Sequence, residues 1–136
     1  YFIEGLKAFK DHSPYPIRLT AAEKSFDGET PLLIISLTNS VGGFESFAKD
    51  ARVDDGLLHV FIVKQLGFFD ALQALPKLLT GKISDADQVE YFTTKEVHVD
   101  SKERLPINAD GDTAGHLPVT VQVLSQHLTV FAPVSN

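Results

Sequence analysis

Apolar residues recur along most of the chain in short runs that predict β-strands. Polar and apolar residues alternate from Ile17 to Phe26, and continuous apolar runs cover 31–39 and 57–63. Alternation indicates a strand with one buried face, whereas a short continuous apolar run is typical of a strand covered on both faces. Roughly seven or eight short strands are predicted in all, and the remaining strand-like segments are 89–99, 117–124 and 127–133.

Two segments have helical periodicity instead. Residues 1–10 place apolar side chains at helical spacing, and residues 68–82 do so over a longer stretch. Gly81 fits the C-terminal end of the second helix, and Pro76 inside it predicts a kink. With two short helices among many strands, the predicted fold class is mainly β, an antiparallel β-sandwich.

Glycine-rich and acidic segments mark the predicted connections. Residues 26–29, Phe-Asp-Gly-Glu, have the composition of a hairpin turn. Residues 40–44 contain two adjacent glycines and are expected to form a flexible connection. Residues 50–56 are expected to form a loop ahead of the second apolar strand.

Composition narrows the class of protein. The 136 residues suit one domain with its own core, and 43% hydrophobic with 22% charged residues is ordinary for a globular protein. The net charge of -6 argues against nucleic acid as a partner. Cysteine is absent, which fits a cytosolic protein and excludes a thiolate nucleophile. Without any Met, and beginning in mid-pattern, the sequence suggests a fragment of a larger protein.

The most acidic turn lies within residues 104–118. Asn108, Asp110 and Asp112 match the first three ligand positions of an EF-hand loop, but the required Gly and Glu are replaced by Thr113 and Val119. The flanks also have strand rather than helix patterning, so a calcium loop is rejected. A solvent-facing hairpin turn and part of an active site both remain, and the residues alone favour the turn.

A second acidic segment, Val-Asp-Asp-Gly at 53–56, precedes the apolar run 57–63. Oxygen-rich loops of this kind suit a hard cation such as magnesium, especially where backbone carbonyls help. Asp54 and Asp55 would point in opposite directions in an extended segment, so only one of them is expected to be a ligand. The alternative is a solvated turn, which the local sequence favours.

The five histidines have no metal-ligand spacing. His59 lies within an apolar strand and is either a hydrogen-bonded core residue or a pocket liner, with the core favoured. His98 is expected to face solvent. The sequence contains no nucleophile elbow, no dinucleotide-binding glycine motif and no P-loop. The residues alone therefore indicate a soluble β-sandwich with two acidic loops.

Four segments in order resemble one family, and together they run over nearly the whole chain: 37–63, 75–82, 105–115 and 128–133. The most specific part is Asn-Ser-x-Gly-Gly-Phe-Glu followed by Asp-x-x-x-Asp-Asp-Gly. These segments are similar to the C-terminal domain of soluble bacterial diacylglycerol kinases and related lipid kinases, relatives of the sphingosine kinases. The resemblance implies that residues 1–136 form the C-terminal β-sandwich domain, which supplies the lipid site. The Gly-Gly-Asp-Gly-Thr motif of the family's N-terminal nucleotide-binding domain does not occur in the sequence.

The resemblance also assigns candidate site residues. The residue after Asp-Gly in the motif Asn-x-Asp-Gly-Glu, within 105–115, is the family's proton acceptor for the lipid hydroxyl, and here it is Asp112. The family usually has Glu at this position, so the carboxylate is one methylene shorter. The family's magnesium site falls on the Asp55 side chain with the backbone carbonyl oxygens of Arg52 and Leu57.

An apolar pocket for the acyl chains is a further expectation. A β-sandwich can open between its sheets to admit such a chain, and aromatic side chains commonly line pockets of this kind. The candidate liners also have an ordinary role as core residues, which is favoured for each of them: Phe44, Phe61, Phe68 and Phe69.

The function implied is an ATP-dependent lipid kinase that transfers the γ-phosphate to the hydroxyl of diacylglycerol or a similar lipid. Its expected cofactor is Mg²⁺, ATP is the co-substrate, and the partners are the lipid and the N-terminal nucleotide-binding domain. Such an enzyme is expected to be cytoplasmic with peripheral membrane contact, and this chain alone is expected to be inactive. The alternatives are a non-catalytic module that binds a divalent cation or an apolar ligand, and a kinase of another substrate such as NAD. The oligomeric state is left open, a homodimer being one option.

Overall fold

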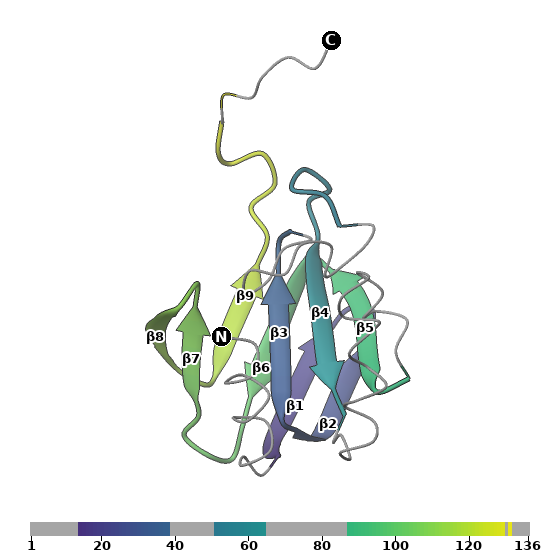
Figure 1. The fold of residues 1–136 in the computed structure, drawn as a ribbon, viewed down its shortest axis with the longest axis vertical. Helices are drawn as coiled ribbons and strands as arrows, with labels where there is room; N and C mark the ends of the chain where they lie inside the picture. The colour runs from purple at the N-terminus through teal and green to yellow at the C-terminus, as the bar shows by residue number, and fades with distance from the viewer. Residues whose placement is uncertain (1–13, 39–50, 65–86, 130, 132–136) are drawn as a thin grey trace, which may run out of the picture.

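The structure is a computed structural model that describes residues 14–38, 51–64, 87–129 and 131. Its described part contains nine strands in three antiparallel sheets (Figure 1). The four-stranded sheet has the order β2-β1-β6-β9, with β1 (Tyr15–Ala21), β2 (Ser25–Thr30), β6 (Glu96–Asp100) and β9 (Val119–Gln122). The three-stranded sheet has the order β3-β4-β5, with β3 (Leu32–Ser36), β4 (Leu58–Val63) and β5 (Val89–Thr94). A separate hairpin consists of β7 (Pro106–Ala109) and β8 (Asp112–His116).

The two larger sheets pack face to face and confirm the predicted β-sandwich. Alternate residues of β1 and β6 point inward, whereas Arg18 and His98 between them are exposed, as the period of two in a strand requires. The three-stranded sheet contributes the inward-facing residues of β4. The resulting core cluster is Ile17, Leu19, Leu58, Val60, Ile62, Val97 and Val99, each no more than 7% exposed.

The central strand of the smaller sheet, β4, is buried along its whole length. Its inward-facing residues belong to the core cluster, and Phe61 lies on the opposite face, where its ring centroid is 4.9 Å from that of Tyr91. Phe61 is 0% exposed. Burial of both faces explains the continuous apolar run that predicted this strand.

The segment predicted to be a hairpin turn at 26–29 is part of a strand, so that prediction was wrong. The chain reverses earlier, where the Ala21 N–H donates to the Lys24 carbonyl at 2.8 Å. Residues 25–30 then pair with β1, which places Asp27 opposite Arg18. Asp-Gly favours a turn only when the flanking strands can pair around it. Here the apolar side chain of Phe26 packs against the core instead, and this holds the Asp-Gly pair inside β2.

Two other strand predictions also need correction. The segment 89–99 is two strands rather than one, because the chain crosses from one sheet to the other at Lys95. Buried Thr94 fixes this crossing, since its hydroxyl donates to the Glu96 carbonyl at 2.9 Å. The segment 127–133 contains no strand among its described residues, and the side chain of Leu128 is 83% exposed. Its sequence alternates as a strand does, but no strand in the described part of the chain pairs with it. Without a neighbouring strand to pair with, the described residues of this segment do not form a β-strand.

Several predictions fall outside the described residues. They are the two helices at 1–10 and 68–82, the glycine-rich connection at 40–44, and the aromatic residues Phe44, Phe68 and Phe69. Within the described ranges the chain forms no helix, and so none that is long and apolar enough to cross a membrane.

An ion cluster joins the two sheets at one edge of the sandwich. Lys24, in the turn after β1, lies 2.5 Å from one carboxylate oxygen of Glu90 on β5, and Lys64 lies 3.3 Å from the other oxygen. The hydrogen bond from Lys24 lowers the pKa of Glu90 most, and that from Lys64 lowers it further, against an opposing effect of burial. The ionised form of Glu90 therefore stabilises the fold.

We expect Glu90→Gln to lower the free energy of unfolding by up to about 1 kcal/mol at neutral pH. Because the pKa of Glu90 is lower in the folded than in the unfolded state, its contribution is present above the unfolded value, near pH 4.3, and is lost as the pH falls through the folded value. Urea unfolding of both proteins between pH 7 and pH 3 measures this. Glu96→Gln, an exposed carboxylate with no ion pair to any described residue, is the control. A Glu90 effect that does not change with pH would contradict the assignment.

Candidate functional site

The loop before β4, residues 52–57, is closed by the side chain of Asp55 and is called the acidic loop below. The Arg52 N–H donates to Asp55 Oδ2 at 3.0 Å, and the Leu57 N–H donates to Oδ1 at 2.9 Å. The Asp55 N–H in turn donates to the Arg52 carbonyl at 3.3 Å. Gly56 has a φ of 69°, a left-handed conformation that glycine adopts without strain. The loop therefore holds one carboxylate in a defined orientation.

The two neighbouring carboxylates of this loop point in different directions, as predicted. The Asp54 side chain is 64% exposed and forms a two-point contact with the Arg52 guanidinium, at 2.9 Å and 3.1 Å. The Asp55 side chain is only 19% exposed and points inward. A single carboxylate of the pair is therefore placed to act as a ligand from within the loop.

His59 holds the inner side of the Asp55 carboxylate. Its Nε2 lies 3.0 Å from Asp55 Oδ2, and its Nδ1 lies 2.7 Å from the hydroxyl of Tyr91. The His59 side chain is 3% exposed, which confirms the predicted hydrogen-bonded core residue. The two rings are stacked at 6.0 Å between centroids. A hydrogen-bonded chain thus runs from the acidic loop into the three-stranded sheet.

The environment of Asp55 favours its ionised form. Burial raises the pKa of this carboxyl, but the hydrogen bonds that it accepts from two backbone N–H groups and from His59 outweigh burial, and the pKa lies below its ordinary value. Asp55 is therefore a carboxylate at neutral pH, as a metal ligand must be.

The donor set of the acidic loop fits a hard cation. Asp55 Oδ2 accepts two hydrogen bonds and Oδ1 accepts one, which leaves an acceptor position on Oδ1. The carbonyls of Arg52 and Leu57 are oxygen donors in the same loop. Magnesium is commonly held by one or two carboxylates together with other oxygens. No group of three His, Asp or Glu side chains suited to a metal occurs in the described ranges, so any site here depends on these backbone oxygens.

The acidic segment within residues 104–118 forms the predicted hairpin turn. Asp110 and Gly111 both have positive φ, 53° and 100°, as the two central residues of a type I′ hairpin turn require. The Asn108 side chain accepts a hydrogen bond from the Gly111 N–H at 2.9 Å and braces the turn. Asp112 is the first residue of β8 and is exposed. Its backbone pairs with Ala109 of β7, but its side chain forms no hydrogen bond or ion pair with any described residue.

The hairpin is anchored at its base and carries Asp112 near its tip. The Leu117 N–H donates to the Leu105 carbonyl at 3.0 Å, and both leucine side chains pack against the core cluster. In the view of Figure 1, the tip of β7 and β8 points toward the end of the sandwich at which β4 begins. The acidic loop lies at that end, directly before Leu58. The hairpin tip and the acidic loop thus lie toward the same end of the sandwich, although no hydrogen bond or ion pair joins Asp112 and Asp55.

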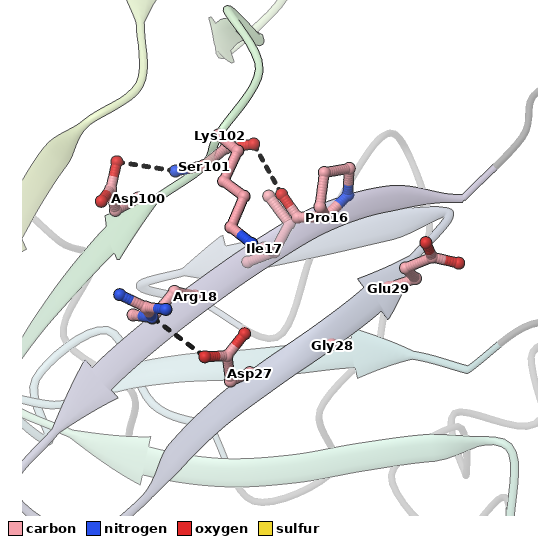
Figure 2. Close-up of a pocket in the computed structure, with 9 residues that line it drawn as sticks. All are labelled: Pro16, Ile17, Arg18, Asp27, Gly28, Glu29, Asp100, Ser101 and Lys102. Carbon is pink, nitrogen blue, oxygen red and sulfur yellow. Dashed lines mark hydrogen bonds and ion pairs between the residues drawn. The ribbon is translucent and has the colours of Figure 1, made fainter.

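Two surface concavities lie at opposite ends of β1. Figure 2 shows the first, of about 440 Å³, in which Arg18 and Asp27 point toward one another across neighbouring strands. It contains none of the predicted site residues, and its charged side chains of both signs do not suit an acyl chain. The second, of about 690 Å³, lies at the end of β1 that is nearer the acidic loop. Its lining residues are Thr20, Ala21, Ala22, Glu23, Leu57, Thr94, Lys95, Glu96 and His98.

The sequence reasoning did not find that His59 and Tyr91 belong to the site. A polar residue inside an apolar strand needs a hydrogen-bond partner, and this signalled that His59 is paired. The identity of the partners depends on the turn at Gly56 and on the register that places Tyr91 opposite Phe61. Neither can be obtained from local spacing.

The class of protein defined by these features is an antiparallel β-sandwich with a carboxylate-centred loop and an acidic hairpin. The chain belongs to the family described as the YegS C-terminal NAD kinase beta sandwich-like domain, whose model matches residues 1–132. The family resemblance predicted from the four sequence segments is therefore confirmed.

Relatives and solved structures agree with this membership. The chain is 32% identical over 133 residues to a diacylglycerol kinase of Staphylococcus carnosus and 29% identical to one of Bacillus subtilis, with 98% of this chain covered in each case. It spans 44% of the length of both relatives. A crystal structure of a diacylglycerol kinase from Bacillus anthracis superposes with a TM-score of 0.70 at 21% identity, covering 90% of this chain and 42% of that one. This last match shows the fold.

Proposed function

We propose that this chain is the acceptor-substrate domain of an ATP-dependent lipid kinase, which phosphorylates the hydroxyl of diacylglycerol or a similar lipid. The observation that carries the proposal is the placement of Asp112. Its carboxylate is exposed, directly follows a hairpin turn braced by Asn108, and has no partner among the described residues. A carboxylate that forms no hydrogen bond or ion pair within the described fold is available to bind a substrate.

Asp112 acts in this proposal as the general base. Phosphoryl transfer is catalysed mainly by positioning and by neutralisation of charge. The attacking alcohol nevertheless needs an acceptor within hydrogen-bond reach as its proton leaves. The Asn108 side chain braces the turn at Asp110 and Gly111, so the backbone that presents the Asp112 carboxylate to a bound hydroxyl has a defined conformation.

The acidic loop supplies the cation site in this proposal. Asp55, with the carbonyl oxygens of Arg52 and Leu57, holds Mg²⁺, which offsets phosphate charge or organises the acidic loops around it. Asp55 contributes a carboxylate that stays ionised, and the hydrogen bonds within the loop keep its orientation.

The remaining parts of the enzyme lie in the portion of the relatives' length that this chain does not span. We assign to it the nucleotide-binding domain, which binds most of the ATP. A lipid hydroxyl resides at a membrane surface, so the intact enzyme is proposed to be cytoplasmic and to contact the membrane peripherally. The domain described here is expected to have no kinase activity on its own.

A product assay tests the reaction and its acceptor. The intact protein is supplied with labelled ATP and Mg²⁺, in one reaction with diacylglycerol in vesicles and in another with NAD, because the family description includes NAD kinase. We expect labelled phosphate to be transferred to the lipid and none to NAD. Label in NAD alone would replace the lipid by NAD as the acceptor, and no label in either product would favour a non-catalytic binding module.

A further inference from the structure

The buried hydrogen-bonded chain behind the acidic loop carries a further inference, which rests on the proposed cation site. We propose that His59 and Tyr91 are positioning residues that commit one oxygen of Asp55 to the protein and so reserve the other, Oδ1, for the cation. Neither residue touches the cation in this proposal. Each acts through the Asp55 carboxylate.

The hydrogen bonds of Asp55 divide unequally between its two oxygens. Oδ2 accepts from the Arg52 N–H and lies 3.0 Å from His59 Nε2, which together fill its two acceptor positions. Oδ1 accepts only the Leu57 N–H, at 2.9 Å. An ionised carboxylate therefore has one position left for a ligand, and it is on Oδ1. Asp55 is expected to bind a cation through one oxygen rather than two.

The direction of the His59 bonds follows from the chemistry of its neighbours. An ionised carboxylate accepts and cannot donate, so Nε2 carries the proton in the bond to Asp55. In the neutral imidazole, Nδ1 is then the acceptor, and it accepts from the Tyr91 hydroxyl at 2.7 Å. Tyr91 thus selects the ring form that donates to Asp55, in the way that outer hydrogen bonds orient metal ligands generally.

The sheet makes this arrangement rigid. His59 and Phe61 are on one face of β4, and Tyr91 lies on the same face of β5, opposite Phe61. The Tyr91 ring is held between two neighbours, 4.9 Å from Phe61 and 6.0 Å from His59 between ring centroids. His59 and Phe61 are 2% and 0% exposed, so neither can change rotamer without disturbing the packing. The orientation of a loop carboxylate is therefore set by the most buried strand of the sandwich.

The test is calorimetric titration of the intact protein with Mg²⁺ alone. Replacing a residue that hydrogen-bonds to a metal ligand weakens metal binding by about 10- to 100-fold. We expect a loss of that size for His59→Leu. His59→Gln restores an amide N–H near the Nε2 position and is expected to stay within about threefold of the wild type. Tyr91→Phe is expected to fall between them. His98→Gln, at an exposed histidine of β6, is the matched control and should leave Mg²⁺ binding unchanged.

The titrations separate this inference from the proposed function beneath it. If Asp55→Asn leaves Mg²⁺ binding unchanged, the cation site itself is wrong and the inference falls with it. If Asp55→Asn abolishes binding while folded His59→Leu binds within about twofold of the wild type, the inference alone is overturned. Equal losses in the His59→Leu and His59→Gln variants would overturn it as well. They would show that the N–H donated to Asp55 does not matter and that His59 acts only through packing.

A second measurement keeps the inference testable if His59→Leu fails to fold. Nitrogen-resolved NMR of the wild-type imidazole identifies which ring nitrogen carries the proton. A protonated Nε2 supports the inference, and an unprotonated Nε2 overturns it. Tyr91→Phe removes one hydroxyl and keeps the ring, and unchanged Mg²⁺ binding in that variant would exclude Tyr91 as a positioning residue.

Discussion

Replacing Asp112 by Asn in the intact protein is expected to lower kcat for lipid phosphorylation by roughly 10²- to 10⁴-fold, the usual contribution of a general base. Asn has the same size but cannot accept the hydroxyl proton. KM is expected to change little, because the carboxylate acts as the hydroxyl proton leaves rather than in binding the lipid. Steady-state kinetics with diacylglycerol in vesicles provide both constants.

The matched control is Asp110→Asn, which makes the same change of charge two residues earlier. Asp110 has a φ of 53°, and Asn tolerates that conformation, so the turn is retained. We expect this variant to be close to wild type. Asp112→Glu restores the side-chain length usual in the family and should keep activity. Near-normal kcat in folded Asp112→Asn would remove Asp112 from the mechanism.

Asp55→Asn is expected to have the second large effect, a loss of Mg²⁺ affinity of at least about 100-fold with a parallel loss of activity. The amide offers one oxygen and one NH2 group where the carboxylate accepts three hydrogen bonds. At least one of the N–H groups that donate to Asp55 would therefore face the NH2 group of the amide. This is expected to lower the free energy of unfolding by about 1–3 kcal/mol. Calorimetric Mg²⁺ titration and urea unfolding measure the two effects separately.

Asp54→Asn is the control for this second variant. It removes the neighbouring charge, but Asp54 is exposed and paired only with Arg52 among the described residues. Its effects on Mg²⁺ affinity and on stability are expected to be small, since exposed ion pairs contribute little. If the two Asn variants behave alike, the general negative charge of the loop, and not the held carboxylate, is responsible.

The strands were predictable wherever burial was regular. Alternation in β1 and the continuous apolar run of β4 each identified a strand and the faces that it buries. The segment 26–29 was misassigned because Asp-Gly is a local turn signal, whereas the turn forms at the residues before Lys24. Pairing across a sheet is a contact between distant residues, and it overrides a local preference of this size.

The candidate site divides in the same way. The family motifs located Asp55 and Asp112, and the hairpin at Asp110 and Gly111 was predicted from their conformational preferences alone. Local chemistry could not rank Asp112 above the other polar residues of its turn. The structure adds that the Asp112 side chain is exposed and has no partner among the described residues, whereas the Asp55 carboxylate is held by three hydrogen bonds.

Sequence patterning was thus enough for the fold class, the positions of most strands and the two acidic segments, because each depends on residues close together in the chain. The partners of Asp55 depended on the tertiary structure. Tyr91 is 32 positions from His59, and it reaches Nδ1 only because β4 and β5 pair in one register. A shift of one residue would turn Tyr91 to the other face of the sheet, and the carboxylate would lose the support that orients it.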